Sequence, residues 1–107
     1  MTPVEVERTI HEMARRIVEL FHPEKIILFG SHARGEAGPD SDLDVLLIVR
    51  DKAAGRKRQM REIGYMLDPY GEVIPSIMAY TETEWEDRRK SGSRFRKSVE
   101  RDKVRVL

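Results

Sequence analysis

The sequence predicts an α/β or α+β fold, with three or four strands and helices on one side of the sheet. Two short apolar runs, 25–29 and 43–49, are typical of buried strands. Segments with apolar residues at helical spacing precede, separate and follow them. Such alternation is typical of layered folds. Because 107 residues is the length of one domain, we expect a single domain over 1–107.

The first half of the chain is expected to form a helix, a strand and a loop. Apolar residues recur at steps of three and four over 4–21, which predicts an amphipathic helix that ends before Pro23. The run KIILF at 25–29 resembles a strand buried on both faces. Glycines then predict a loop over 31–40, with one helical turn beginning at Ser31.

The middle of the chain is expected to add two strands and a helix. The most apolar stretch, 43–49, predicts the second strand, and a helix over 50–67 follows it. A turn over 68–71 leads into a third strand over 72–80. Pro75 indicates an edge position or a bulge for this strand, because proline cannot donate a hydrogen bond to a central ladder.

Two short helices are expected near the end of the sequence. Thr81 and Glu84 have the spacing of a capping box, which predicts the start of a helix that carries Trp85. Ser-Gly-Ser at 91–93 ends this helix, and a basic helix with Phe95 among its apolar residues leads into the terminal VRVL.

Composition excludes several classes of protein. The 20 basic and 19 acidic residues give a net charge of +1, so overall charge does not require a nucleic acid or an anionic membrane as partner. The absence of cysteine excludes disulfides, thiolate zinc sites and a cysteine nucleophile. No apolar run approaches the ~20 residues that cross a bilayer, and we expect a cytoplasmic protein. Association with a partner or a further copy would help to stabilise so small a core.

Two aspartates stand at the start of the second predicted strand. Because successive strand side chains point to opposite faces, Asp42 and Asp44 project the same way, about 7 Å apart at their stems. Their hard oxygen ligands suit Mg²⁺ or Mn²⁺, and Mg²⁺ in proteins commonly also binds substrate phosphates. A solvated rim of the strand is the alternative explanation.

The loop before these aspartates has features that suit a phosphate. Gly30 allows close approach of the backbone, Ser31 offers a hydroxyl and a helix-start amide, and Arg34 offers a fork of donors. The loop and the aspartates lie at the ends of adjoining predicted strands. The sequence therefore predicts a combined site for a metal and a phosphate.

These residues carry a resemblance to a known family. GSHARG at 30–35 followed by SDLD at 41–44 resembles the GSxARG…SDxD signature of the minimal nucleotidyltransferase family, in the DNA polymerase beta-like superfamily. The resemblance implies a small mixed sheet flanked by helices and the transfer of a nucleoside monophosphate, usually AMP from ATP, to a hydroxyl group. Many members pair with a helical partner protein, as toxin and antitoxin, and modify a tyrosine of that partner.

The resemblance also implies a role for each matching residue. The divalent metals, Mg²⁺ or Mn²⁺, would be held by Asp42 and Asp44, which are thereby the catalytic residues. The nucleotide would be bound by the loop, in which Gly30 and Ser31 grip the triphosphate while Arg34 and Ser41 support the loop or the phosphates.

One position departs from the family pattern. The third carboxylate of the family stands on the strand after the second helix and corresponds by position to Ser76. Because serine cannot act as an anionic ligand or general base, a catalytically impaired nucleotide- or partner-binding module is an alternative function. The acids that could substitute are Glu36 and Asp40 in the loop and Glu72 on the same strand.

Basic residues gather in two further places. One cluster opens the second helix and comprises Arg50, Lys52, Arg56, Lys57, Arg58 and Arg61. The other lies in the last third of the sequence and comprises Arg88, Arg89, Lys90, Arg94, Arg96, Lys97 and Arg101. Solvated helix faces explain both, and a surface for nucleic acid or an acidic partner is the alternative, which would make the chain a nucleic-acid-binding module.

Overall fold

The computed structural model describes residues 3–38, 41–63 and 75–107. The first described elements are α1 (Pro3–Phe21), β1 (Lys25–Phe29), the short helix α2 (Gly30–Arg34) and β2 (Leu43–Val49). They are followed by the 3-10 helix η1 (Asp51–Arg56), α3 (Lys57–Glu62) and β3 (Pro75–Thr81). The remaining elements are α4 (Glu82–Lys90), α5 (Arg94–Asp102) and β4 (Val104–Arg105).

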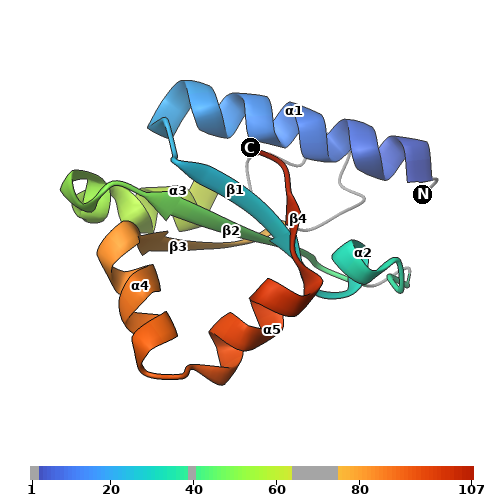
Figure 1. The fold of residues 1–107 in the computed structure, drawn as a ribbon. Coiled ribbons are helices and arrows are strands. Elements are labelled where there is room, and N and C mark those ends of the chain that lie inside the picture. The colour runs from blue at the N-terminus through green and yellow to red at the C-terminus, as the bar shows by residue number, and fades with distance from the viewer. Residues whose placement is uncertain (1–2, 39–40, 64–74) are drawn as a thin grey trace.

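The strands form one mixed sheet in the order β3-β2-β1-β4 (Figure 1). Strand β1 runs antiparallel to both β2 and β4, whereas β2 and β3 run parallel. The mixed sheet expected from the sequence is therefore confirmed. Strand β3 is outermost among the described strands, which confirms the edge position that Pro75 indicated.

Helices cover both faces of the sheet, so the expectation of helices on one side is wrong (Figure 1). On one face, Met13 and Ile17 of α1 and Met60 of α3 pack on alternate residues of the three longer strands. On the other face, Trp85 of α4 and Val99 of α5 form a second cluster with the intervening strand residues. Helical periodicity predicts that a helix has an apolar side but not which face of a sheet it covers.

The predicted helix over 50–67 begins differently from the expectation. Its first residues form η1, in which the amide of Ala53 donates to the carbonyl of Arg50, before α3 begins at Lys57. Gly55 lies in this segment, and glycine disfavours the regular α-helix. The rest of that helix beyond Ile63, the turn over 68–71 and the first residues of the third predicted strand lie outside the described residues.

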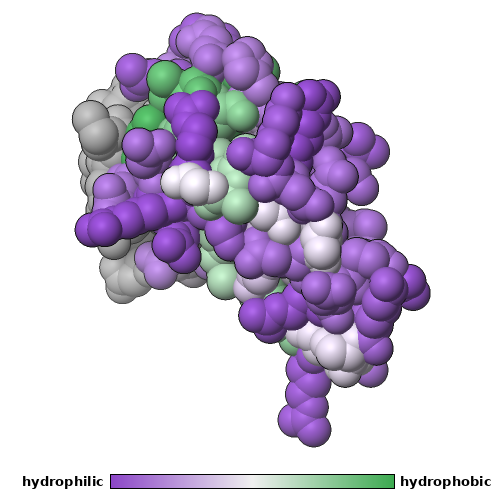
Figure 2. Space-filling model, turned by 90° about the vertical axis from the view of Figure 1, so that its left-hand side faces the viewer, coloured by the Kyte–Doolittle hydropathy of each residue, from purple (hydrophilic) through white to green (hydrophobic). Residues whose placement is uncertain are grey.

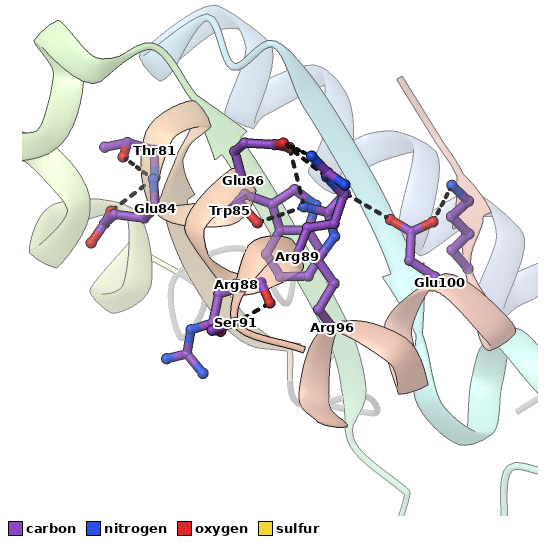
Figure 3. Close-up of polar contacts among 10 residues, drawn as sticks. Thr81, Glu84, Trp85, Glu86, Arg88, Arg89, Ser91, Arg96 and Glu100 are labelled. Atoms are coloured by element: carbon purple, nitrogen blue, oxygen red, sulfur yellow. Dashed lines mark hydrogen bonds and ion pairs between the residues drawn. The ribbon is translucent and has the colours of Figure 1, made fainter. Parts of the chain in front are cut away.

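The capping box at Thr81 is confirmed. The Thr81 hydroxyl accepts a hydrogen bond from the Glu84 amide at 3.1 Å, and the Glu84 carboxylate accepts one from the Thr81 amide at 2.9 Å (Figure 3). The Glu84 carboxylate also accepts from Lys57 Nζ at 2.7 Å, which ties α4 to α3. The start of α4 is thereby fixed against the segment that follows β2.

Arg96 joins α5 to α4 (Figure 3). Its guanidinium lies 4.7 Å from the ring centroid of Trp85 and donates to the Trp85 carbonyl at 2.5 Å. It also donates to Glu100 at 3.3 Å. Stacking and hydrogen bonding of this kind suit arginine better than lysine, so this member of the second basic cluster has a structural use.

The surface is mainly hydrophilic on the side shown in Figure 2, with a limited apolar area. This agrees with the 36% of charged residues in the sequence. Within residues 3–38, 41–63 and 75–107, no helix has the length and apolar character needed to cross a membrane.

We predict that Thr81→Val lowers the free energy of unfolding by about 1 kcal/mol, because it removes the cap while keeping the side-chain shape. Thr81→Ser, which keeps the hydroxyl, should lose less. Urea unfolding monitored by circular dichroism measures both. A Thr81→Val variant as stable as wild type would contradict the capping role.

Candidate active site

The sheet register brings three predicted site segments to one end of the sheet. Asp44, in β2, pairs with Phe29 at the end of β1 and with Ser76 near the start of β3. Helix α2, which begins at Gly30, follows Phe29 directly at this end (Figure 1). The loop and the aspartates therefore lie together, as expected from adjoining strand ends.

The two aspartates are close enough to affect each other. Asp42 is exposed and Asp44 half-buried. Burial raises the pKa of Asp44, and the charge of Asp42 raises it further, while His32 and Arg34 act in the opposite direction. A cation between two such carboxylates would relieve their repulsion.

The residues present fit a magnesium ion but do not enclose it. Mg²⁺ is typically bound by one or two carboxylates together with waters and substrate phosphates. Asp42 and Asp44 could supply the carboxylates. No group of three or more His, Asp or Glu side chains suited to a metal occurs among the described residues. Among the described residues, Asp42 and Asp44 are thus the two carboxylates that could hold such an ion, and other ligands would complete its coordination.

Gly30 is required by the position of Asp44. Its φ of +75° lies in the left-handed region, which favours glycine. A Cβ at this position would overlap Oδ2 of Asp44 and lie 3.2 Å from its Cγ. The Asp44 carboxylate thus lies close to the backbone at the start of α2, and a Cβ at residue 30 would force this carboxylate to move.

The loop after Gly30 is closed by its own backbone and by Ser41. The amide of Glu36 donates to the carbonyl of Ser31 at 2.9 Å. The Ser41 hydroxyl accepts from the Gly38 amide at 2.8 Å, and the Ser41 amide donates to the Gly38 carbonyl at 3.2 Å. These contacts join Ser41 to Gly38, and the expected roles of Ser41 toward the loop or the phosphates stay predictions.

Arg34 is bound by two carboxylates. Its Nη1 donates to Asp102 of α5 at 2.7 Å, and its Nε donates to Glu36 at 3.0 Å. The Asp102 carboxylate also accepts from Arg101 Nε at 2.9 Å, and its side chain is only 4% exposed. These contacts hold the Arg34 guanidinium beside α5, and its expected roles toward the loop or the phosphates stay predictions.

Sequence reasoning missed Asp102. It lies 68 residues from Arg34, and no motif joins them. A usable signal was present, because Asp102 follows Val99 by three residues and so falls near the buried side of a short helix. A carboxylate in such a position needs a cationic partner.

Ser76 lies beside Asp44, on the same face of the sheet, and its side chain is exposed. No described residue forms a hydrogen bond with its hydroxyl. Of the three acids that could substitute for a carboxylate here, Glu36 is paired with Arg34. Asp40 and Glu72 lie outside the described residues.

Several side chains of the first basic cluster are used inside the molecule. Lys57 bonds both carboxylate oxygens of Glu84, at 2.7 and 2.8 Å. The guanidinium of Arg56 lies 4.8 Å from the ring centroid of Phe21, and Arg50 pairs with Glu24. Such pairing reduces the charge offered to a polyanion, and the nucleic-acid surface stays a prediction.

Comparison with known proteins agrees with this fold. A family model described as a nucleotidyltransferase domain matches residues 10–105. Over 36 residues the chain is 42% identical to a Methanocaldococcus jannaschii protein assigned as a protein adenylyltransferase, and this match covers 34% of the chain and 36% of that protein. The crystal structure of a Sulfolobus solfataricus protein assigned as a nucleotidyltransferase is similar to this one, with a TM-score of 0.63 and 22% sequence identity. The match covers 97% of this chain and 81% of the Sulfolobus chain, and it shows that the two share a fold. Because the family model spans most of its length, the chain belongs to the nucleotidyltransferase domain family.

Proposed function

We propose that the protein is a metal-dependent nucleotidyltransferase that transfers AMP from ATP to a hydroxyl group. The observation that carries this proposal is the contact of the Asp44 carboxylate with the Gly30 backbone, which joins the acidic pair to the start of the glycine loop. An acidic pair alone would suit many cations. An acidic pair against a Gly-Ser loop suits a cation that arrives with a triphosphate.

Asp42 and Asp44 would hold Mg²⁺ or Mn²⁺ in this function. When bound, the metal would neutralise phosphate charge and favour departure of pyrophosphate. Gly30 and Ser31 would bind the triphosphate, with Ser41 closing the loop around it. Arg34 would support this loop from the other side.

In the proposed reaction, the oxygen of the acceptor hydroxyl forms a bond to the α-phosphorus of ATP. The bond from that phosphorus to the bridging oxygen of the β-phosphate breaks, and pyrophosphate leaves. The hydroxyl proton passes to solvent, because Ser76 occupies the place where a carboxylate would otherwise accept it.

We further propose that the acceptor is a tyrosine of a helical partner protein, within a toxin and antitoxin pair. The relative assigned as a protein adenylyltransferase supports a protein acceptor, over the 36 residues that match. The basic side chains of α5 would favour a partner with an acidic surface.

A second candidate is supported by Ser76. With a neutral hydroxyl beside Asp44, the described residues offer two carboxylates at the site, which would suffice for MgATP binding but supply no further base. In this case the protein would bind nucleotide, or a partner, without efficient transfer. Binding without release of pyrophosphate would distinguish this function from the first.

We predict that the wild-type protein binds ATP only with Mg²⁺ present and that Asp42→Asn/Asp44→Asn abolishes this binding, because the metal loses both carboxylates. Isothermal titration calorimetry measures it, and circular dichroism should show an intact fold. Asp87→Asn, an exposed change on α4, is the control. Because the pKa of Asp44 is raised above 3.8, affinity should begin to fall on acidification at a higher pH than an ordinary aspartate would give. Equal magnesium-dependent binding by the double variant would overturn the assignment.

We predict that Gly30→Ala weakens MgATP binding, because the new Cβ displaces the Asp44 carboxylate. The variant should also destabilise the fold by about 1 kcal/mol or more, because alanine must then adopt the left-handed backbone conformation of Gly30. Gly55→Ala is the matched control, since nothing lies within 4 Å of a Cβ there. Calorimetry and thermal unfolding measure the two effects. If Gly30→Ala bound MgATP as wild type does, the close contact with Asp44 would have no functional value.

We predict that Ser76→Asp raises the rate of pyrophosphate release from MgATP, with free tyrosine as acceptor, by about 100-fold, because it places a base and a third carboxylate beside Asp44. Ser76→Asn, of similar size but neutral, should leave the rate unchanged. A rate that stays at the wild-type value in both variants would show that this position does not limit transfer.

A further inference from the structure

We infer that Asp102 is a positioning residue, which holds the loop at Gly30 and Ser31 in place by binding Arg34 at the far end of α2. The inference rests on the proposed function, because its consequence is tighter binding of MgATP. It assigns to α5 a part in the site although α5 contributes none of the proposed ligands.

The first support is the geometry of the ion pair. Arg34 Nη1 lies 2.7 Å from Asp102 Oδ2, and the Asp102 side chain is 4% exposed, so water competes little for this carboxylate. The Arg34 Nε is meanwhile bound to Glu36, so two edges of the guanidinium are fixed in one orientation. A fork bound at two points restricts rotation more than a single contact does.

The second support is how little of α2 is buried, although His32 Nε2 also lies 3.4 Å from the carbonyl oxygen of Ser41. None of its residues is buried, and Ala33 alone among them packs on a core cluster, from a partly buried position. Gly35, with φ of +74°, ends the helix in a turn that other residues rarely adopt. A five-residue helix with so little burial depends on its polar contacts for a fixed orientation.

The third support is the arrangement of charges. Asp102 lies between Arg34 and Arg101, and it accepts hydrogen bonds from both. These bonds lower the pKa of Asp102, with Arg101 the larger contributor, so the carboxylate is ionised at neutral pH. Without its charge, the two guanidinium groups would repel each other, and Arg34 would be drawn away from α5.

A competing role for Arg34 is direct binding of phosphate. The two roles predict different effects on MgATP affinity when the Asp102 carboxylate is removed. If Arg34 supports the loop through Asp102, removal of either residue has the same effect. If Arg34 binds phosphate directly, removal of Asp102 releases the guanidinium and leaves affinity unchanged or increased.

A double-mutant cycle in the full chain separates these roles. We expect Arg34→Gln and Asp102→Asn each to weaken MgATP binding roughly tenfold, and the double variant to be no weaker than either single one, since both remove one interaction. Glu100→Gln is the matched control, because Glu100 lies on the same helix but pairs with Arg96 and Lys103. Additive losses, or wild-type affinity in Asp102→Asn, would overturn the inference.

Amide hydrogen exchange gives a second readout that a general loss of stability would not produce. In Asp102→Asn, exchange should accelerate in the peptide that covers 30–35 and stay unchanged in α1, whereas Glu100→Gln should leave both as in wild type. Unchanged exchange at 30–35 would overturn the inference. Absence of MgATP binding in the wild-type protein would instead overturn the proposed function, and the exchange experiment would still test the contact.

Discussion

The burial of β2 on both faces is the constraint on which the site depends. Leu43, Val45, Leu47 and Val49 point into one core cluster, while Leu46 and Ile48 point into the other. A slip of one residue would exchange these two sets and move every side chain of the strand to the opposite face. The hydrophobic cores therefore fix the register of β2, and the place of Asp44 in the sheet follows from that register.

The local elements were largely predictable from sequence because their signals are local. The run KIILF gave β1 with its observed bounds, the apolar run over 43–49 gave β2, and the capping box located the start of α4. The meeting of the glycine loop with the aspartates was also predictable, since strands that follow one another in the sequence usually lie side by side.

The long-range features were not predictable for equally physical reasons. Which face of the sheet α4 and α5 cover depends on how the chain crosses its edge, and no periodicity reports this. The pairing of Arg34 with Asp102 joins two segments 68 residues apart. Because the chain has 19 acidic residues, the sequence alone does not show which of them pairs with Arg34. The sequence predicted, from position alone, that Ser76 stands where the family has its third carboxylate. The parallel register of β2 and β3 places Ser76 beside Asp44.

Arginine has two separate uses in this fold. Arg96 is 15% exposed and fastens α5 to α4 by stacking on Trp85 and donating to the Trp85 carbonyl, whereas its bond to Glu100 lies within α5. Arg34 fastens the other end of the same helix to the loop. Helix α5 is thus held at both ends by guanidinium groups, with Val99 buried between them. The basic residues of these segments therefore serve to attach α5 to α4 and α2 as well as to place charge on the surface.

The separation between Arg34 and Asp102 also bears on the order in which the molecule matures. A chain is synthesised from its N-terminus, so Arg34 leaves the ribosome 68 residues before Asp102 does. During that interval β1, β2 and β3 can pair, but α2 lacks its carboxylate on α5. The glycine loop can therefore gain this ion pair only after the residues of β1, β2 and β3 have been synthesised, whereas β4, which completes the described sheet, follows Asp102 in the sequence.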